Sequence, residues 1–81
     1  MAKITLMAPF GADSFGGRDV LTLEAGNIFA LVRMLDALSP GFGENADVRL
    51  AFAVDGTVTS DWATMLNAQS EVIVLPRVGG G

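Results

Sequence analysis

Residues 71–76 read EVIVLP and residues 77–81 read RVGGG. The continuous apolar run from Val72 to Leu75 is bounded by turn-forming residues and is typical of a strand in the middle of a sheet. Pro76 is expected to end this strand, because proline cannot donate to a strand ladder. The three final glycines have no side chains and allow any backbone torsion. The pattern therefore predicts a central strand that leads directly into a slender glycine tail.

Two segments near the start of the chain have the pattern of a first hairpin. Residues 3–8 have the period-2 pattern of a strand with one face against a core, in which Ile4, Leu6 and Ala8 alternate with Lys3, Thr5 and Met7. The β-type run Val20–Leu23 follows a loop, residues 11–18, that is rich in glycine and turn-forming residues. We expect the two strands to pair across this long loop.

A second hairpin is predicted further along the chain. Residues 48–54 alternate in the same way and end at Asp55 and Gly56. Asp-Gly between two β-type runs is the strongest short hairpin signal, because both central positions of a type I′ turn need positive φ. Thr57–Thr59 should be the return strand, and residues 60–66 have no clean period beyond a short turn of helix.

One helix is predicted between the two hairpins. Asn27 is a preferred N-cap residue, and the segment Ile28–Leu38 places apolar residues along one stripe, namely Ile28, Leu31, Leu35 and Leu38. Pro40 and Gly41 then stop the helix. The order of elements is strand, strand, helix, strand, strand, strand. This order predicts the α+β class, with one helix packed on one sheet.

Composition excludes several classes of chemistry. The chain has 81 residues, enough for one domain, and it contains no cysteine and no histidine. Disulfides, imidazole or thiolate metal sites and Ser-His triads are therefore impossible within it. Its formal net charge of -4 disfavours nucleic acid and anionic membranes as partners. No stretch is long and apolar enough for a membrane span, so a cytoplasmic location is expected.

The chain resembles the ubiquitin-like β-grasp sulfur carriers of the MoaD/ThiS type along nearly all its length. The resemblance rests on Pro40-Gly41-Phe42, on the strand that ends at Val54-Asp55-Gly56, and on residues 71–76 leading to terminal glycines. Its length and long first loop look more like the small subunit of molybdopterin synthase than the shorter thiamine-pathway carrier. The implied fold is a β-grasp domain over residues 1–76, a mixed sheet of about five strands with one main helix on one face, and a flexible C-terminal glycine tail over residues 77–81.

The resemblance also implies a chemistry for the tail. In that family the C-terminal glycine is adenylated by an E1-like enzyme that uses ATP, and is then converted to a thiocarboxylate that donates sulfur. Gly80 and Gly81 match the family's diglycine, although three glycines stand where two are usual, so either could be the reactive end. The carrier binds no cofactor or metal and is a co-substrate, not an enzyme. The implied partners are the activating enzyme, a persulfide sulfur donor, and the large subunit of molybdopterin synthase or another sulfur acceptor.

An exposed apolar patch is the predicted partner surface. The alternation rule places Met7, Ile73 and Leu75 on the sheet face opposite the core, with Val58 as a further member. The alternative is that residues 11–18 cover part of this set. The segment leading to the reactive end completes the predicted partner-binding residues: Pro76, Arg77, Val78 and Gly79.

Other interpretations of the sequence remain open at this stage. Arg77 stands where the family commonly has a second proline, and Trp62 is expected to fill the core or an edge rather than to stack on a cofactor. The sulfur acceptor could belong to thiamine or other sulfur metabolism. The same terminus would also suit a ubiquitin-like protein modifier, and an inert tail would leave a β-grasp interaction module.

Overall fold

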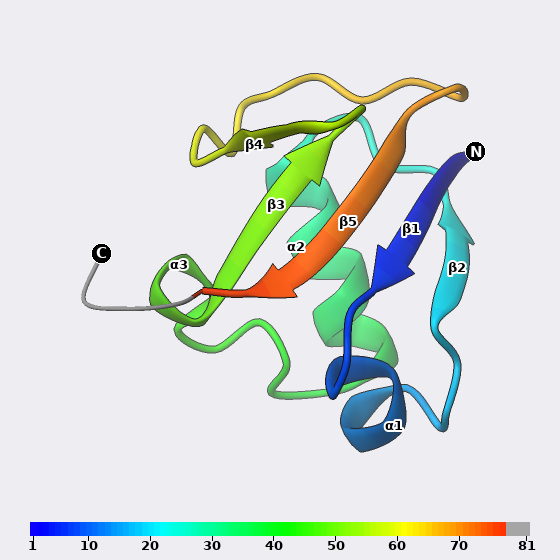
Figure 1. Ribbon diagram of the computed structural model, residues 1–81, viewed down its shortest axis with the longest axis vertical. Helices are drawn as coiled ribbons and strands as arrows, with labels where there is room; N and C mark the ends of the chain where they lie inside the picture. The colour runs from blue at the N-terminus through cyan, green and yellow to red at the C-terminus, as the bar shows by residue number, and fades with distance from the viewer. Residues whose placement is uncertain (78–81) are drawn as a thin grey trace.

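The computed structural model describes residues 1–77, in which five strands form one sheet (Figure 1). The predictions made for Val78, Gly79, Gly80 and Gly81 therefore lie outside the described residues. The strands are β1 (Ala2–Leu6), β2 (Val20–Leu23), β3 (Leu50–Val54), β4 (Thr57–Thr59) and β5 (Glu71–Pro76). The helices are α1 (Phe10–Ser14), α2 (Ile28–Leu38) and α3 (Ala46–Arg49).

The sheet is mixed, and its order across the sheet is β2-β1-β5-β3-β4. β5 runs parallel to β1 and antiparallel to β3, so it is the central strand, as its continuous apolar run predicts. β1 pairs with β2 and β3 pairs with β4 as antiparallel hairpins, which confirms both hairpin predictions, although the first strand ends at Leu6 and not at residue 8. Arg77 N donates to Arg49 O at 2.9 Å, so the hydrogen bonding between β5 and β3 continues one residue beyond Pro76.

Helix α2 covers one face of the sheet and has the predicted bounds (Figure 1). The Asn27 side chain accepts a hydrogen bond from Ala30 N at 2.8 Å, which satisfies one of the open N–H groups at the helix start. The buried residues of α2 are Ile28, Leu31, Val32 and Leu35. Leu38 was expected on this stripe but is 50% exposed, because the helix ends there and its last turn leaves the core.

The turn between β3 and β4 has the predicted geometry. Asp55 has φ of 50° and Gly56 has φ of 87°, which are the positive values that a type I′ turn requires. The Asp55 carboxylate also accepts a hydrogen bond from Glu71 N at 2.9 Å. The turn is therefore tied to the start of β5, sixteen residues away in the sequence.

The prediction of an unstructured first loop is wrong in part, because α1 lies within it. Phe15, directly after α1, is buried and packs edge to face on Phe42, with the ring centroids 4.8 Å apart. Phe10 makes a second edge contact with the same ring at 5.5 Å. A five-residue helix has little stability of its own, so these long-range aromatic contacts hold it in place.

The predicted strand over residues 48–54 is also shorter than expected, because its first two residues belong to α3. Asn45 precedes α3 in the left-handed conformation, with φ of 56°. The Arg49 guanidinium donates to Phe42 O at 3.1 Å and to Glu44 O at 2.6 Å, which closes the loop before the strand. Residues 60–66 contain no helix. Within residues 1–77 no helix has both the length and the apolar character needed to cross a membrane.

Candidate functional site

The face of the sheet opposite α2 carries a row of residues that is apolar except for Thr5. The strand register places Ile73 beside Ala53, and Ala53 beside Val58 on the edge strand. On the same face, toward β1 and β2, Ile73 lies beside Thr5 and Thr5 lies beside Val20. Because side chains alternate along each strand, all five point away from the core that α2 covers.

The residues predicted for the partner surface lie on this face. Met7 is 47% exposed, Ile73 36% and Val58 66%, while Leu75 is half-buried between them. Met7, Val58 and Ile73 are exposed, so residues 11–18 do not cover these three side chains. We call Met7, Val58, Ile73 and Leu75 the sheet patch; its role in binding a partner stays a prediction.

A polar row marks one end of the sheet patch. Lys3 lies beside Glu71 in the register of β1 and β5, and Glu71 N is bound by the Asp55 carboxylate. The apolar residues follow in the direction of the chain, with Leu75 paired to Ala51 near the end of β5. The patch therefore extends toward the end of the sheet from which the predicted tail leaves.

Arg77, the last described residue, is held at two points. Its backbone N–H donates to Arg49 O at 2.9 Å, and its guanidinium Nη1 donates to Asp47 O at 2.6 Å. Pro76 before it pairs with Leu50 in the sheet register. The two predicted partner-binding residues that the structure describes beyond Leu75 are thus fixed against α3 and the start of β3.

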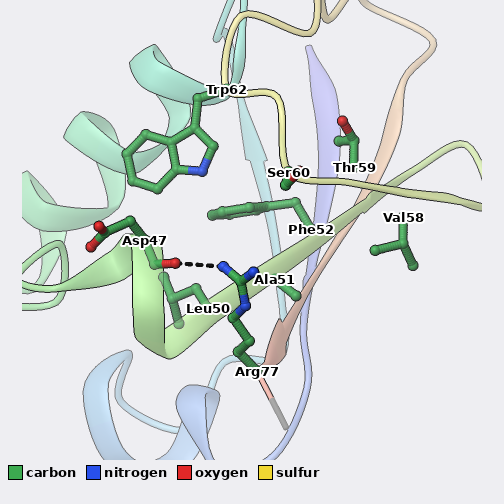
Figure 2. Close-up of a pocket in the computed structure, with 9 residues that line it drawn as sticks. All are labelled: Asp47, Leu50, Ala51, Phe52, Val58, Thr59, Ser60, Trp62 and Arg77. Carbon is green, nitrogen blue, oxygen red and sulfur yellow. Dashed lines mark hydrogen bonds between the residues drawn. The ribbon is translucent and has the colours of Figure 1, made fainter. Parts of the chain in front are cut away.

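A pocket of about 370 Å³ opens beside Arg77 (Figure 2). Leu50, Phe52 and Trp62 supply its apolar walls, while Ser60 and Arg77 supply polar groups. A second hollow of about 570 Å³ shares Asp47, Ser60 and Trp62 with the first and continues toward Phe29 of α2. The pocket joins segments from three separate parts of the chain, so no local sequence pattern could have indicated it.

Trp62 packs against the edge of the core, as the sequence predicts. It is half-buried, and its ring meets Phe29 edge to face at 5.4 Å and Phe52 at 6.0 Å. It lines both hollows described above. The part of the chain that the structure describes holds no group of three or more His, Cys, Asp or Glu side chains placed to bind a metal.

Comparison with known proteins gives structural similarity alone. No protein-family model matches the chain, and no curated protein matches it. Among solved structures, the chain is similar to Mycobacterium tuberculosis CysO, described as an antigen, with a TM-score of 0.81 and 16% identity, covering 96% of this chain and 100% of that one. It is also similar to small archaeal modifier protein 1 from Methanosarcina acetivorans, with a TM-score of 0.77 and 17% identity, covering 99% and 95%.

A third similar structure is the BexX/CysO complex of Amycolatopsis orientalis, which matches with a TM-score of 0.78 and 11% identity over 100% of both chains. The matches extend over nearly all of each chain, and their structural similarity establishes the fold. Sequence identities this low do not establish the activity. The mixed five-strand sheet with α2 packed on one face is a ubiquitin-like β-grasp fold.

Proposed function

We propose that this chain is a ubiquitin-like sulfur carrier whose C-terminal glycine is adenylated and then converted to a thiocarboxylate. The observation that carries the proposal is the combination of a β-grasp sheet with a central strand, β5, after which the sequence ends in three glycines. Such an arrangement gives a rigid body for recognition and a slender carboxylate-bearing end for chemistry. The reactive end is Gly81 or Gly80.

The first step requires the carboxylate to enter a narrow nucleotide site on an E1-like partner. The carboxylate oxygen attacks the α-phosphorus of ATP, which forms an acyl adenylate and releases pyrophosphate. Glycines suit this approach because they present no side chain and tolerate backbone torsions that other residues avoid. ATP is bound and used by the activating enzyme, while the carrier supplies only the nucleophile.

The second step must take its sulfur from outside the chain, since the sequence has no cysteine. A persulfide on a donor protein attacks the acyl carbon and displaces AMP, which leaves an acyl disulfide. A second thiol of the donor system then cleaves the sulfur–sulfur bond and becomes part of a disulfide. The products are a thiocarboxylate on the carrier and an oxidised donor, so the electrons balance.

The sheet patch is the proposed docking surface for the partners. Exposed apolar side chains on an uncovered sheet face are typical of protein interfaces, and this group points toward the end of β5. The BexX/CysO complex supports the proposal, because it contains a protein of the same fold bound to another protein. For the activating enzyme we expect contacts to Met7, Val58, Ile73 and Leu75, with residues 76–79 guiding the approach.

We propose molybdopterin biosynthesis as the destination of the sulfur, with the chain as the small subunit of molybdopterin synthase. The support is the length of the chain and its long first connection between β1 and β2, thirteen residues that include α1. The large synthase subunit would then take the thiocarboxylate. Thiamine or another sulfur metabolite is the alternative destination, and supplying each acceptor enzyme to the thiolated carrier distinguishes them.

A protein modifier is the second candidate function. The specific observation in its favour is the fold similarity to small archaeal modifier protein 1, over 99% of this chain. A modifier uses the same adenylated terminus but joins it to lysine side chains. Conjugates would appear as heavier species on a denaturing gel, whereas a dedicated carrier would give none.

An adenylation assay tests the proposal. The wild-type chain is incubated with a candidate E1-like enzyme, ATP and labelled pyrophosphate, and exchange of the label into ATP is measured. A chain extended by one alanine after Gly81 is the matched control, because its domain is unchanged and its terminus is not glycine. We expect exchange with the wild type and none with the extended chain. Equal exchange with both would contradict the proposal, and a lack of exchange with all candidate enzymes would favour the interaction module with an inert tail.

A further inference from the structure

We propose that the pocket beside Arg77 receives an acidic side chain of the protein partner that takes the C-terminal tail. This inference rests on the proposed function, because it names a feature of the partner's contact surface. The pocket has a volume of about 370 Å³ and combines one guanidinium group with hydroxyl and aromatic walls. Nothing in the sheet patch itself requires such a site, so the inference adds a charged contact to an otherwise apolar docking surface.

The polar groups at the pocket favour an anion. The Arg77 guanidinium has several N–H donors in a planar fork, and Nη1 donates to the Asp47 carbonyl oxygen at 2.6 Å. That acceptor is neutral, so this bond orients the guanidinium without neutralising its charge. Figure 2 shows the Asp47 carboxylate directed away from the guanidinium, while the indole nitrogen of Trp62 faces the pocket. The hydroxyl of Ser60 is a further donor at the rim.

The apolar walls favour a carboxylate carried on a short apolar stem. Phe52 and Leu50 are almost fully buried beneath the pocket, and Trp62 is half-buried against Phe52. Trp62 is the accessible one of these walls, and its ring can pack against the methylene groups of an entering side chain. A carboxylate can then form paired hydrogen bonds with the guanidinium fork, which are among the stronger polar contacts in proteins. A glutamate or aspartate side chain has this chemistry.

The position of the pocket indicates a protein partner as the source of the carboxylate. Val58 belongs to both the sheet patch and the pocket lining, and Ala51 lines the pocket beside Leu75 of the patch. A partner that covers the patch and receives the segment after Arg77 must therefore pass over the pocket mouth. The chain as a whole carries a net charge of -4 and repels acidic surfaces. An acidic group would be accepted at Arg77 but disfavoured elsewhere, which would make the contact selective.

The first arm of the test measures anion binding to the isolated chain. Phenylacetate is titrated while the fluorescence of Trp62, the single tryptophan, is recorded, and neutral phenylacetamide serves as the matched probe. We expect a saturable change with phenylacetate, half-complete on the order of 10 mM for so small a ligand, and a much weaker change with phenylacetamide. The change should be lost in Arg77→Gln. It should persist in Arg33→Gln, which removes the same charge from an exposed position on α2. An equal response to both probes, or an unchanged response in Arg77→Gln, would overturn the inference.

The second arm identifies the source of the carboxylate through the activating enzyme. In the pyrophosphate exchange assay, Arg77→Gln should raise the KM for the chain about tenfold, the effect of one charge-assisted contact. Arg77→Lys should recover part of the loss. Arg33→Gln should leave the KM unchanged. Phenylacetate should compete with the wild-type chain. Exchange that is equally efficient with Arg77→Gln, or phenylacetate binding without competition, would overturn the inference while leaving the proposed function intact. Absence of exchange with the wild type would instead contradict the proposed function. Unfolding midpoints of all variants serve as the folding control.

Discussion

Replacing valine by threonine at positions 58 and 74 separates the two faces of the sheet with one chemical change. Threonine has nearly the shape of valine and keeps its preference for strands, so the main difference is a hydroxyl in place of a methyl. Val74 lies in β5 and is 0% exposed, among the residues that α2 covers. Val58 lies in β4, points to the opposite face and is 66% exposed. The effect of the substitution should therefore follow the difference in burial between the two side chains.

The expected cost differs by several-fold between the two positions. A hydroxyl buried at position 74 loses its hydrogen bonds to water and enters a site built for a methyl group, which lowers the free energy of unfolding by about 2 kcal/mol. For a domain of this size, that lowers the thermal unfolding midpoint by roughly 8–16 °C. At position 58 the hydroxyl stays in water, and the change should remain within about 0.5 kcal/mol.

Thermal unfolding followed by circular dichroism gives the unfolding midpoint of both variants, and urea titration gives their free energy of unfolding under the same conditions. Equal destabilisation at the two positions would refute the assignment of the sheet faces. It would also remove the basis for treating the sheet patch as an available surface, because Val58 would then have to be covered.

Three further predictions test other parts of the account. Ile73→Asp should raise the KM for the activating enzyme at least about tenfold while the chain stays folded, and an unchanged KM would exclude Ile73 from the interface. Asn27→Ala should destabilise the fold by about 1 kcal/mol in urea titration, because it removes the cap on Ala30 N; no loss would mean that the cap does not stabilise α2. Gly56→Ala should cost about 1 kcal/mol from its positive φ alone, since an added Cβ meets nothing within 4 Å. Gly26→Ala, which has equally open space but no positive φ, is its control and should show no comparable loss.

The parts of the fold that the sequence predicts correctly are those controlled by local chemistry. Helix α2 has the expected bounds because Asn27 caps its start and proline follows its end. The β3–β4 turn follows from Asp55 and Gly56, whose backbone angles few other pairs adopt easily. The central position of β5 agrees with its continuous apolar run, although one face of the strand stays open and Ile73 is 36% exposed. For α2 and the β3–β4 turn the deciding interactions lie within a few residues of one another, whereas β5 is indicated by its own composition and placed by pairing with the distant β1 and β3.

The parts that the sequence does not predict depend on contacts between distant segments. Helix α1 is held by Phe10 and Phe15 against Phe42, which is more than twenty residues away. The members of the sheet patch are predicted by alternation, because strand geometry alone assigns them to one face. The pocket beside Arg77 is not, since Trp62, Leu50 and Arg77 meet only after the sheet and its edge loop have formed. A pattern within one segment carries no information about such a meeting.

The most direct test of the central claim is the intact mass of the chain after incubation with ATP, an E1-like enzyme and a persulfide donor. We expect a gain equal to the exchange of one oxygen atom for sulfur, and fragmentation should place it on the last peptide. The same spectrum would identify whether Gly80 or Gly81 carries the sulfur. An unchanged mass under conditions in which the enzyme thiolates its own established carrier would contradict the assignment of this chain as a sulfur carrier.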